Sequence, residues 1–467
     1  MADFITEQWD QALPVLSEYI AIPARSPMFD PDWQRTGHLR RAAVLLRDWA
    51  AAQQVAGMTV ELIEIEGLTP VLFLEVPATD TRLADHTVLV YGHLDKQPEM
   101  EPWSEGLGPW KPVRRGDRLY GRGGADDGYS VFGAVIALAA AQQRGIRHGR
   151  VCVLIEASEE SSSVHLAEHL SRLLPRIGVA DLVIGLDSFC ETYDRLWTTT
   201  STRGVCGGVL HIDICADDPH SGRASGVLPS AFRVLRVLLD RIEDSATGRV
   251  LIPSATVEVP AYRLEEARVA ASAFPALSTS FRPVPGVQSM GATPYDELVN
   301  ETWHPALEVI GADGLPPVAD AGNVFRSRLS VKLSLRLPPT ADTWQVGEEM
   351  KALLEADAPH GAKVRLDAGA RGPGWASPAF DPWLGRALDQ ASRDHWGAPP
   401  ASCGVGGTIP FMGMLGDPMP DAQFLLIGVL GPESNAHGPD EFLHIPTVQR
   451  VTATVCDVLA AHGEHFG

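Results

Sequence analysis

The sequence predicts an α/β fold in which a discontinuous domain, with a mainly parallel sheet flanked by helices, is interrupted by an inserted α+β domain. Strand and helix patterns alternate through the first 200 residues, and this style returns after a Gly/Pro-rich segment at 371–378. Between these parts, apolar and polar residues alternate as in antiparallel strands with one exposed face. The predicted domains are therefore 1–206 together with 371–467, and 207–370.

The elements of the first part follow from the lengths of its apolar segments. Short apolar runs bounded by turn residues are typical of buried parallel strands, whereas longer periodic segments are typical of helices. In chain order we expect a helix at 40–54, a strand at 87–92, a helix at 131–145, a strand at 151–157, a helix at 165–177 and a strand at 181–187.

The inserted part is expected to be an antiparallel sheet with two helices on one face. Strict alternation predicts strands at 207–216 and 327–337, and an amphipathic pattern predicts a helix at 231–244. After the Gly/Pro-rich segment, a helix at 380–397 and a strand at 423–431 return the chain to the first domain.

Length and charge exclude several classes of protein. The 467 residues are about three times the length of a typical domain, so more than one core is expected. The chain has 59 acidic and 38 basic residues, a formal net charge of −21, which argues against nucleic-acid and membrane partners because phosphate binding needs a basic surface. With 45% hydrophobic and 21% charged residues, the chain is not a disordered protein.

The N-terminal residues predict a cytoplasmic protein. They lack a basic stretch followed by an apolar run, so no signal peptide is expected. The apolar segment at 130–143 is far shorter than the about 20 residues that span a bilayer. The six cysteines show no CxxC pairing, which favours reduced, buried thiols.

The first chemical signal is the pair His93 and Asp95, directly after the strand at 87–92. Residues two apart in an extended chain point the same way, so both side chains project from the edge where open α/β sheets form their sites. A carboxylate can orient a metal-binding histidine. A structural hydrogen bond at a strand end explains the pair as well, and taken alone it is the favoured interpretation.

The second signal is the glycine-rich segment at 121–128, which contains Asp126 and Asp127 and precedes a helix. An aspartate at a helix start can simply cap it, and capping suffices for one of the two. Phosphate binding is excluded, because no Gly-Lys-Ser/Thr follows and two carboxylates would repel the anion.

Three further segments place donors at the ends of apolar strands or in the loop after one. Glu159 and Glu160 follow the strand at 151–157, Asp187 ends the next strand, and His437 lies in a polar loop near the C-terminus. Adjacent acids at a buried strand end are unfavourable unless cations or solvent compensate them. Each segment alone could be a solvated loop.

Together, five separate segments supply an oxygen and nitrogen donor set. One tetrahedral metal with an open position needs about three protein ligands, fewer than this set offers. Five ligands with one bridging carboxylate suit two divalent ions about 3.5–4 Å apart. The expected ligands are His93, Asp126, Glu160, Asp187 and His437. Glu159, beside a ligand but not needed as one, is then the natural general base.

At this point the sequence resembles a dinuclear metallopeptidase family that includes carnosinase, cytosolic non-specific dipeptidase, bacterial dipeptidases, aminoacylase, succinyl-diaminopimelate desuccinylase and glutamate carboxypeptidase. The matching segments occur in the family's order across nearly the whole chain. They are GHLDKQP (92–98), LYGRGGADDG (119–128), EASEESSS (156–163), LD (186–187), TRG (202–204), HSG (220–222), GGTIP (406–410) and NAHGPDE (435–441).

The resemblance implies a role for each metal-site residue. Asp126 would bridge the two ions, His93 and Asp187 would hold one, and Glu160 and His437 would hold the other. Asp95 would orient His93, and Glu159 would transfer the proton. The ions would be zinc, with manganese or cobalt as alternatives, because a donor set of this kind does not by itself select the metal.

The resemblance also implies a homodimer formed through the inserted domain, which would act as a dimerisation or lid domain. His220 would reach into the partner's site and stabilise the tetrahedral intermediate. Arg336 would bind the substrate carboxylate, a role that suits the planar guanidinium. Asn323 and Thr408 would be polar substrate contacts.

The predicted activity is metal-dependent hydrolysis of the amide bond of dipeptides. An alternative is an N-acyl-amino-acid amidohydrolase of the aminoacylase or desuccinylase type. A more remote alternative is a non-catalytic binding protein on the same fold, against which the complete ligand set and Glu159 both argue. Nucleophilic catalysis is disfavoured, because the chain has no Gly-x-Ser-x-Gly elbow.

Overall fold

A computed structural model describes residues 2–273, 276–281, 283–369, 371–407, 410–416 and 418–467. The chain forms two compact units, one of residues 1–200, 377–403 and 410–467, and the other of residues 201–376 and 404–409. The second unit is thus residues 201–376 with the short segment 404–409 added, whereas the sequence predicted a single insertion at 207–370. The catalytic and dimerisation roles assigned to the two domains stay predictions.

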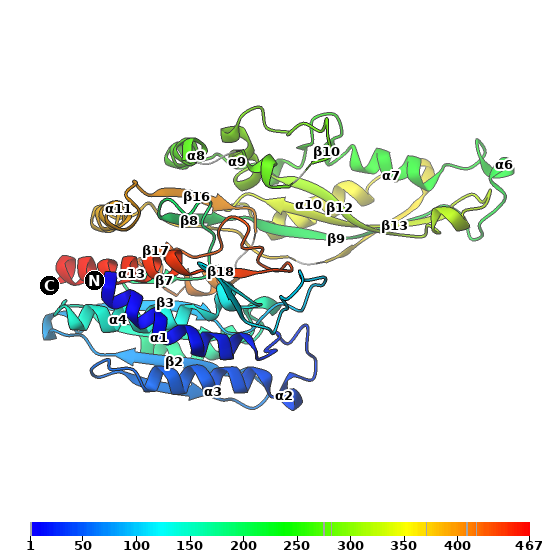
Figure 1. Ribbon diagram of the computed structural model, residues 1–467. Helices are drawn as coiled ribbons and strands as arrows, with labels where there is room; N and C mark the ends of the chain where they lie inside the picture. Colours follow the sequence, from blue (N-terminus) through cyan, green and yellow to red (C-terminus); the bar gives the residue numbers. More distant parts are fainter. Residues whose placement is uncertain (1, 274–275, 282, 370, 408–409, 417) are drawn as a thin grey trace. The chain divides into compact units, whose positions relative to one another are not determined.

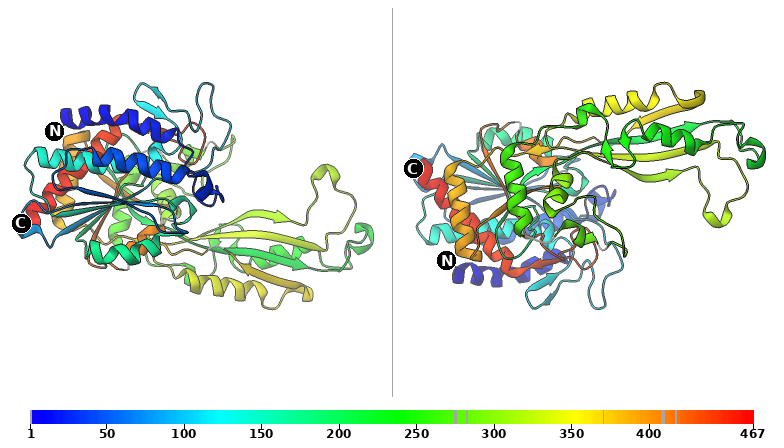
Figure 2. Two further views of the ribbon diagram at one scale, coloured as in Figure 1. Left: turned by 90° about the horizontal axis from the view of Figure 1, so that it is seen from below. Right: turned by 90° about the horizontal axis from the view of Figure 1, so that it is seen from above.

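The first unit contains the parallel strands of a nine-stranded sheet, with helices on both sides of it (Figures 1 and 2). The central strands β6, β3, β7 and β17 are mutually parallel, which confirms the predicted fold class. All seven residues of β3 are buried, as expected for a parallel strand covered on both faces. The strand bounds are β1 (Thr59–Ile63), β2 (Val71–Val76), β3 (Thr87–His93), β6 (Arg150–Glu156), β7 (Leu182–Gly185), β8 (Trp197–Thr202), β15 (Trp375–Ala376), β16 (Ala401–Val405) and β17 (Gln423–Leu426).

The long helices of this unit bury apolar residues at helical spacing. α4 is apolar on all sides and almost completely buried between β3 and the helices α1, α3 and α13, as a central core helix must be. The helix bounds are α1 (Ala2–Ile20), α2 (Trp33–Thr36), α3 (His38–Ala51), α4 (Ser130–Gln143), α5 (Leu166–Ile177), α11 (Pro382–Trp396), α12 (Pro410–Gly416) and α13 (Ile445–Phe466). Among the described residues, no helix has the length and apolar character needed to span a bilayer.

α1 was not among the predicted elements. Its buried residues include Ile5, Trp9 and Leu16, which lie on one face of the helix although Pro14 is inside it. At its C-terminal end, Tyr19 and Ile20 lie against the glycine-rich segment at 121–128. A Cβ atom at Gly128 would overlap the Tyr19 ring, and one at Gly121 would overlap Ile20, so these close approaches require glycine.

A small antiparallel sheet joins two distant parts of the first unit. β18 (Phe442–His444) pairs with β5 (Arg118–Tyr120), which pairs with β4 (Val113–Arg115). Phe442 lies opposite Tyr120. The register therefore places the residues just after Tyr120 beside the residues just before Phe442.

The second unit contains a four-stranded antiparallel sheet in the order β12-β13-β9-β14, with α7 and α10 packed on it, as predicted for the inserted domain. Its core combines alternate residues of β9 and β13 with the apolar faces of both helices. The helices α8 and α9, which pack on each other, were not predicted. The bounds are β9 (Gly204–Asp213), α6 (Ser221–Ala224), α7 (Ala231–Leu239), β10 (Glu243–Asp244), β11 (Arg249–Val250), α8 (Ala261–Ala273), α9 (Pro294–Thr302), β12 (Ala306–Asp313), β13 (Arg328–Leu337), α10 (Thr343–Glu355) and β14 (Lys363–Ala368).

Candidate metal centre

The candidate centre lies at the carboxyl ends of three neighbouring parallel strands. β3 ends at His93, which is in register with Glu156 at the end of β6, and Tyr91 of β3 is in register with Gly185 at the end of β7. Side chains that follow these ends meet at one edge of the sheet. Glu159, Glu160 and Asp187 reach the centre from there.

Two groups of donor atoms form at this edge. One contains His93, Glu159 and Asp187, the other contains His93, Asp126 and Glu160, and in each group the atoms lie within 4.8 Å of one another. His93 Nε2 is 3.3 Å from Asp126 Oδ1 and 3.6 Å from Asp187 Oδ2. The structure therefore brings together the predicted ligands of the first unit and places Glu159 directly beside them.

Asp126 lies between the two histidines of the centre. Its Oδ1 faces His93, while its Oδ2 is 3.0 Å from Nε2 of His437. The same His437 nitrogen is 3.3 Å from Oε2 of Glu160. The two oxygens of one carboxylate thus face two different histidines, an arrangement that a bridging ligand requires.

Asp95 contacts His93, but it also makes contacts that the sequence did not predict. His93 Nδ1 lies 3.1 Å from the main-chain oxygen of Asp95 and 3.5 Å from its carboxylate Oδ1. The two carboxylate oxygens accept hydrogen bonds from the backbone N–H groups of Glu159 and Glu160, each at 3.1 Å. Asp95 therefore fixes the segment that carries both glutamates.

Two further residues of the centre were missed in the sequence. Asp127 accepts a hydrogen bond from the backbone N–H of His93 at 3.1 Å, and Gln97 donates to Glu160 Oε2 at 2.5 Å. Capping was the expected role for one of the paired aspartates. The contact of Asp127 with His93 was not predicted, because the two residues are 34 positions apart and no local sequence pattern indicates their pairing.

Burial and like charges shift three carboxylates of the centre, but not Asp126, toward their neutral forms. Burial, together with the charge of Asp187, raises the pKa of Glu159 well above its ordinary value. Burial and the charge of Asp126 do the same for Glu160, and burial raises the pKa of Asp187 to about 6. Burial also acts to raise the pKa of Asp126, but contacts with His437 and His93 outweigh it and keep that pKa low.

These residues fit divalent cations. Oε1 of Glu160 is buried and has no hydrogen-bond partner among the described residues. A buried carboxylate oxygen without a partner is costly, and a bound cation would remove that cost. Carboxylate oxygens and imidazole nitrogens are also the ligands expected for zinc and manganese.

The predicted substrate residues belong to the second unit. His220 directly precedes α6, is exposed, and accepts a hydrogen bond from the Gly222 N–H at 3.0 Å. Asn323 lies beside it, because its carbonyl accepts from the Ser221 N–H at 3.0 Å. Arg336 is in β13, opposite Ala306 of β12. Contact of these residues with the candidate centre stays a prediction, and Thr408 lies outside the described residues.

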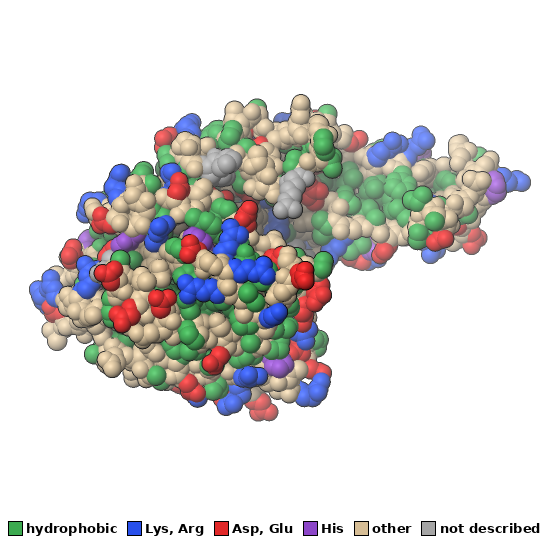
Figure 3. Space-filling model, in the orientation of Figure 1, with side chains coloured by type: hydrophobic (Ala, Val, Ile, Leu, Met, Phe, Trp, Pro, Cys, Tyr) green, Lys and Arg blue, Asp and Glu red, His purple; other side chains and the backbone are tan. Residues whose placement is uncertain are grey.

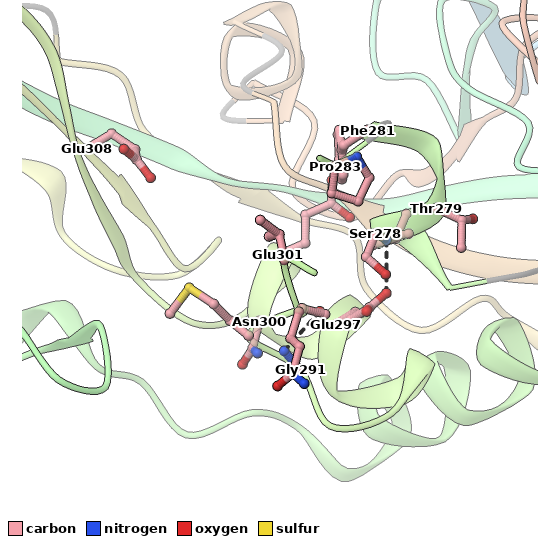
Figure 4. A pocket seen from close by; sticks show the side chains of 14 residues that line it. Ser278, Thr279, Phe281, Pro283, Gly291, Glu297, Asn300, Glu301 and Glu308 are labelled. Atoms are coloured by element: carbon pink, nitrogen blue, oxygen red, sulfur yellow. Dashed lines mark hydrogen bonds between the residues drawn. The ribbon is translucent and has the colours of Figure 1, made fainter. Parts of the chain in front are cut away.

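The second unit also contains a cavity of about 590 Å³ beside α9 (Figure 4). Apolar side chains such as Phe281 and Pro283 and the carboxylates of Glu297, Glu301 and Glu308 line it. Glu297 is occupied by a hydrogen bond from the Ser278 N–H. This cavity contains none of the predicted site residues.

The α/β fold and the donor cluster together define the class of the protein, which is that of the metallopeptidases. The chain belongs to Peptidase family M20/M25/M40, whose family profile matches residues 89–461. This confirms the family and the enzyme class predicted from the motifs, and it implies a divalent-metal requirement.

Individual relatives carry dipeptidase names. Cysteinylglycine-S-conjugate dipeptidase of Corynebacterium striatum is 29% identical over 384 residues, which is 81% of each chain. Beta-Ala-His dipeptidase of Mus musculus is 24% identical over 76% of this chain and 72% of its own. The crystal structure of human carnosine dipeptidase 1 superposes with a TM-score of 0.76 at 22% identity, over 99% of this chain and 98% of that one, and shows the same fold.

Proposed function

We propose that the protein is a dipeptidase that hydrolyses the amide bond of a small peptide with two divalent ions, zinc being preferred to manganese or cobalt. The carrying observation is Asp126, whose Oδ1 faces His93 and whose Oδ2 faces His437. His93 and Asp187 would hold one ion, Glu160 and His437 the other, with Asp126 shared. The names of the relatives support a dipeptide as the substrate.

Glu159 is proposed as the general base. Bound divalent ions would polarise the substrate carbonyl as Lewis acids and would lower the pKa of a water toward neutrality. The Glu159 carboxylate would take the proton of the attacking water and return it to the leaving amine. Asp95 would hold Glu159 in place through its backbone N–H.

The second unit would complete the site in a homodimer. His220 would stabilise the oxyanion of the partner's intermediate, and Arg336 would bind the carboxylate of the substrate, with Asn323 and Thr408 as polar contacts. Exposure of His220 and its position beside Asn323 are compatible with a contact to another subunit. A cytoplasmic location remains part of this proposal.

The test is mass-spectrometric screening of metal-stripped protein reloaded separately with Zn²⁺ or Mn²⁺. Dipeptides and N-acyl amino acids are offered in parallel. Hydrolysis of dipeptides that depends on the added ion is the expected result. Hydrolysis of acyl-amino acids alone would favour the amidohydrolase alternative, and no hydrolysis with two ions bound would favour a binding protein.

A further inference from the structure

Arg122 and Glu441 form a buried ion pair beside the candidate metal centre. Their side chains are 1% and 0% exposed, and Arg122 Nη1 donates to Glu441 Oε2 at 2.5 Å. Burying two charges is unfavourable unless the remaining polar atoms also find partners. The other hydrogen bonds of Arg122 and Glu441 therefore show which segments the buried pair holds together.

The guanidinium of Arg122 reaches two other segments. Its Nη2 donates to the carbonyl of Gly438 at 2.7 Å, and its Nε donates to the carbonyl of Pro98 at 3.1 Å. Glu441 completes the network, because its Oε1 accepts from the Gly123 N–H at 2.8 Å. Both side chains of the pair thus also form hydrogen bonds with backbone groups of the protein.

Three segments meet at this network, and each carries residues of the centre. Pro98 belongs to the segment of His93 and Asp95, residues 121–128 carry Asp126, and residues 435–441 carry His437. The pairing of β18 with β5 continues into a hydrogen bond from the Gly121 N–H to the Glu441 carbonyl at 2.9 Å.

His437 depends most on these contacts. Its side chain is 55% exposed, and within the centre it contacts Asp126 and Glu160. Its backbone has φ of 63°, a conformation that a non-glycine residue adopts at some cost. The neighbouring Gly438 carbonyl is held by Arg122. The surrounding contacts must therefore keep this loop in place.

We propose that Arg122 and Glu441 are a positioning pair that fixes the His437 loop against Asp126 and thereby strengthens binding of the second ion, on the Glu160 and His437 side. This inference rests on the proposed function, because it assumes that these residues hold metal. Partners behind metal ligands typically contribute about 10–100-fold to metal affinity.

The test measures Co²⁺ and Zn²⁺ binding by the full-length wild type and by the variants Arg122→Lys and Glu441→Gln. Lysine keeps the charge but cannot contact Glu441, Gly438 and Pro98 at once. Stepwise addition of Co²⁺, followed by its visible absorption, resolves the two ions, and chelator competition gives each affinity. We expect an unchanged first ion and a second ion bound about 10–100-fold more weakly.

The control is Glu75→Gln, which removes the ion pairs of Glu75 with Arg150 at 2.5 Å and with Arg176 at 2.6 Å, away from the candidate centre. It should leave both metal affinities unchanged even where it lowers the thermal midpoint. Glu441→Asp, which keeps the carboxylate, should restore part of the affinity and replaces Glu441→Gln if that variant does not fold.

Two outcomes separate this inference from the proposed function. If the wild type binds two ions and the Arg122 and Glu441 variants bind both with wild-type affinity, the positioning role alone is overturned. The same holds if Glu75→Gln weakens the second ion as much as these variants do. A wild type that binds no second ion would contradict both the inference and the two-ion function.

Discussion

Asp126 and Glu159 show how two carboxylates of one site come to have different properties. Asp126 contacts two histidines, which keep its pKa low in spite of burial. Desolvation of Glu159 and the nearby charge of Asp187 raise its pKa well above the ordinary value. An ionised bridging oxygen and a carboxylate that readily accepts a proton are the two properties that the proposed hydrolysis needs.

At the residue scale, we predict that Glu159→Gln abolishes turnover without loss of metal. The amide keeps the shape of the side chain but cannot accept the proton of the water, and general-base catalysis contributes about 10²–10⁴-fold to a rate. The measurement is kcat on the best dipeptide together with metal content by elemental analysis. Near-normal turnover would exclude Glu159 as the base, and loss of one ion would make it a ligand.

The sequence predicted those donors that follow strand ends, because position after an apolar run is a local signal. His93, Glu160 and Asp187 are of this kind. It did not predict the contacts that hold them. Arg122 and Glu441 are 319 residues apart along the chain, and their pairing follows from the register of β5 and β18, which no local pattern indicates.

At the element scale, α5 contributes a buried histidine to the packing against the segment before β2. His169 Nε2 lies 2.9 Å from the carbonyl of Thr69, and its Nδ1 is without a partner among the described residues. Burial lowers the pKa of His169 below its ordinary value of about 6.5. The neutral imidazole is therefore the form that the folded protein favours.

The contribution of His169 to stability should consequently fall as the pH falls below about 6.5, since the unfolded chain then binds a proton that folded His169 binds less readily. Stability from this residue is fully present above that pH, and each proton contributes at most about 1.4 kcal/mol per pH unit. Urea unfolding at pH 7.5, 6.5 and 5.5 measures it. His169→Gln should have the smaller slope, whereas a change of the exposed His360 to Asn should not alter it. Equal slopes for wild type and His169→Gln would contradict the assignment.

At the scale of the whole molecule, charge is distributed in two ways. On the face shown in Figure 3, acidic side chains are scattered among basic and neutral ones. The metal-centre carboxylates are instead gathered at one sheet edge. Most acidic residues behind the net charge of −21 are therefore attributed to the surface, and only a few of them lie in the candidate metal centre.

Metal binding should stabilise the folded protein as a whole, because the ions bind the assembled centre and not the unfolded chain. Free Zn²⁺ at 100 times its Kd should add about 2.7 kcal/mol to the free energy of unfolding for one site. Thermal unfolding of metal-stripped protein during a zinc titration measures this. Asp126→Ala should show a much smaller shift, and a shift equal to that of the wild type would place the zinc elsewhere.

Sharing of the site between subunits is a further prediction at this scale. His220→Ala and Asp126→Ala should each be inactive as homodimers, and mixing the two should restore activity, because a mixed dimer contains one site with both residues intact. Denaturation of the mixture and joint refolding allow subunits to exchange. A mixture as inactive as its components would argue that His220 acts within its own chain or not at all.

The close contact of α1 with the glycine-rich segment has a practical consequence for anyone who shortens the chain. The family profile begins at residue 89, yet Tyr19 and Ile20 form one wall of the segment that carries Asp126. The Tyr19 hydroxyl also donates to the carbonyl of Leu94 at 2.8 Å, one residue after His93. A protein trimmed to the region that the family profile matches would thus lack part of the support of the segment that carries Asp126, so a shortened chain that retains the candidate metal centre should also retain α1.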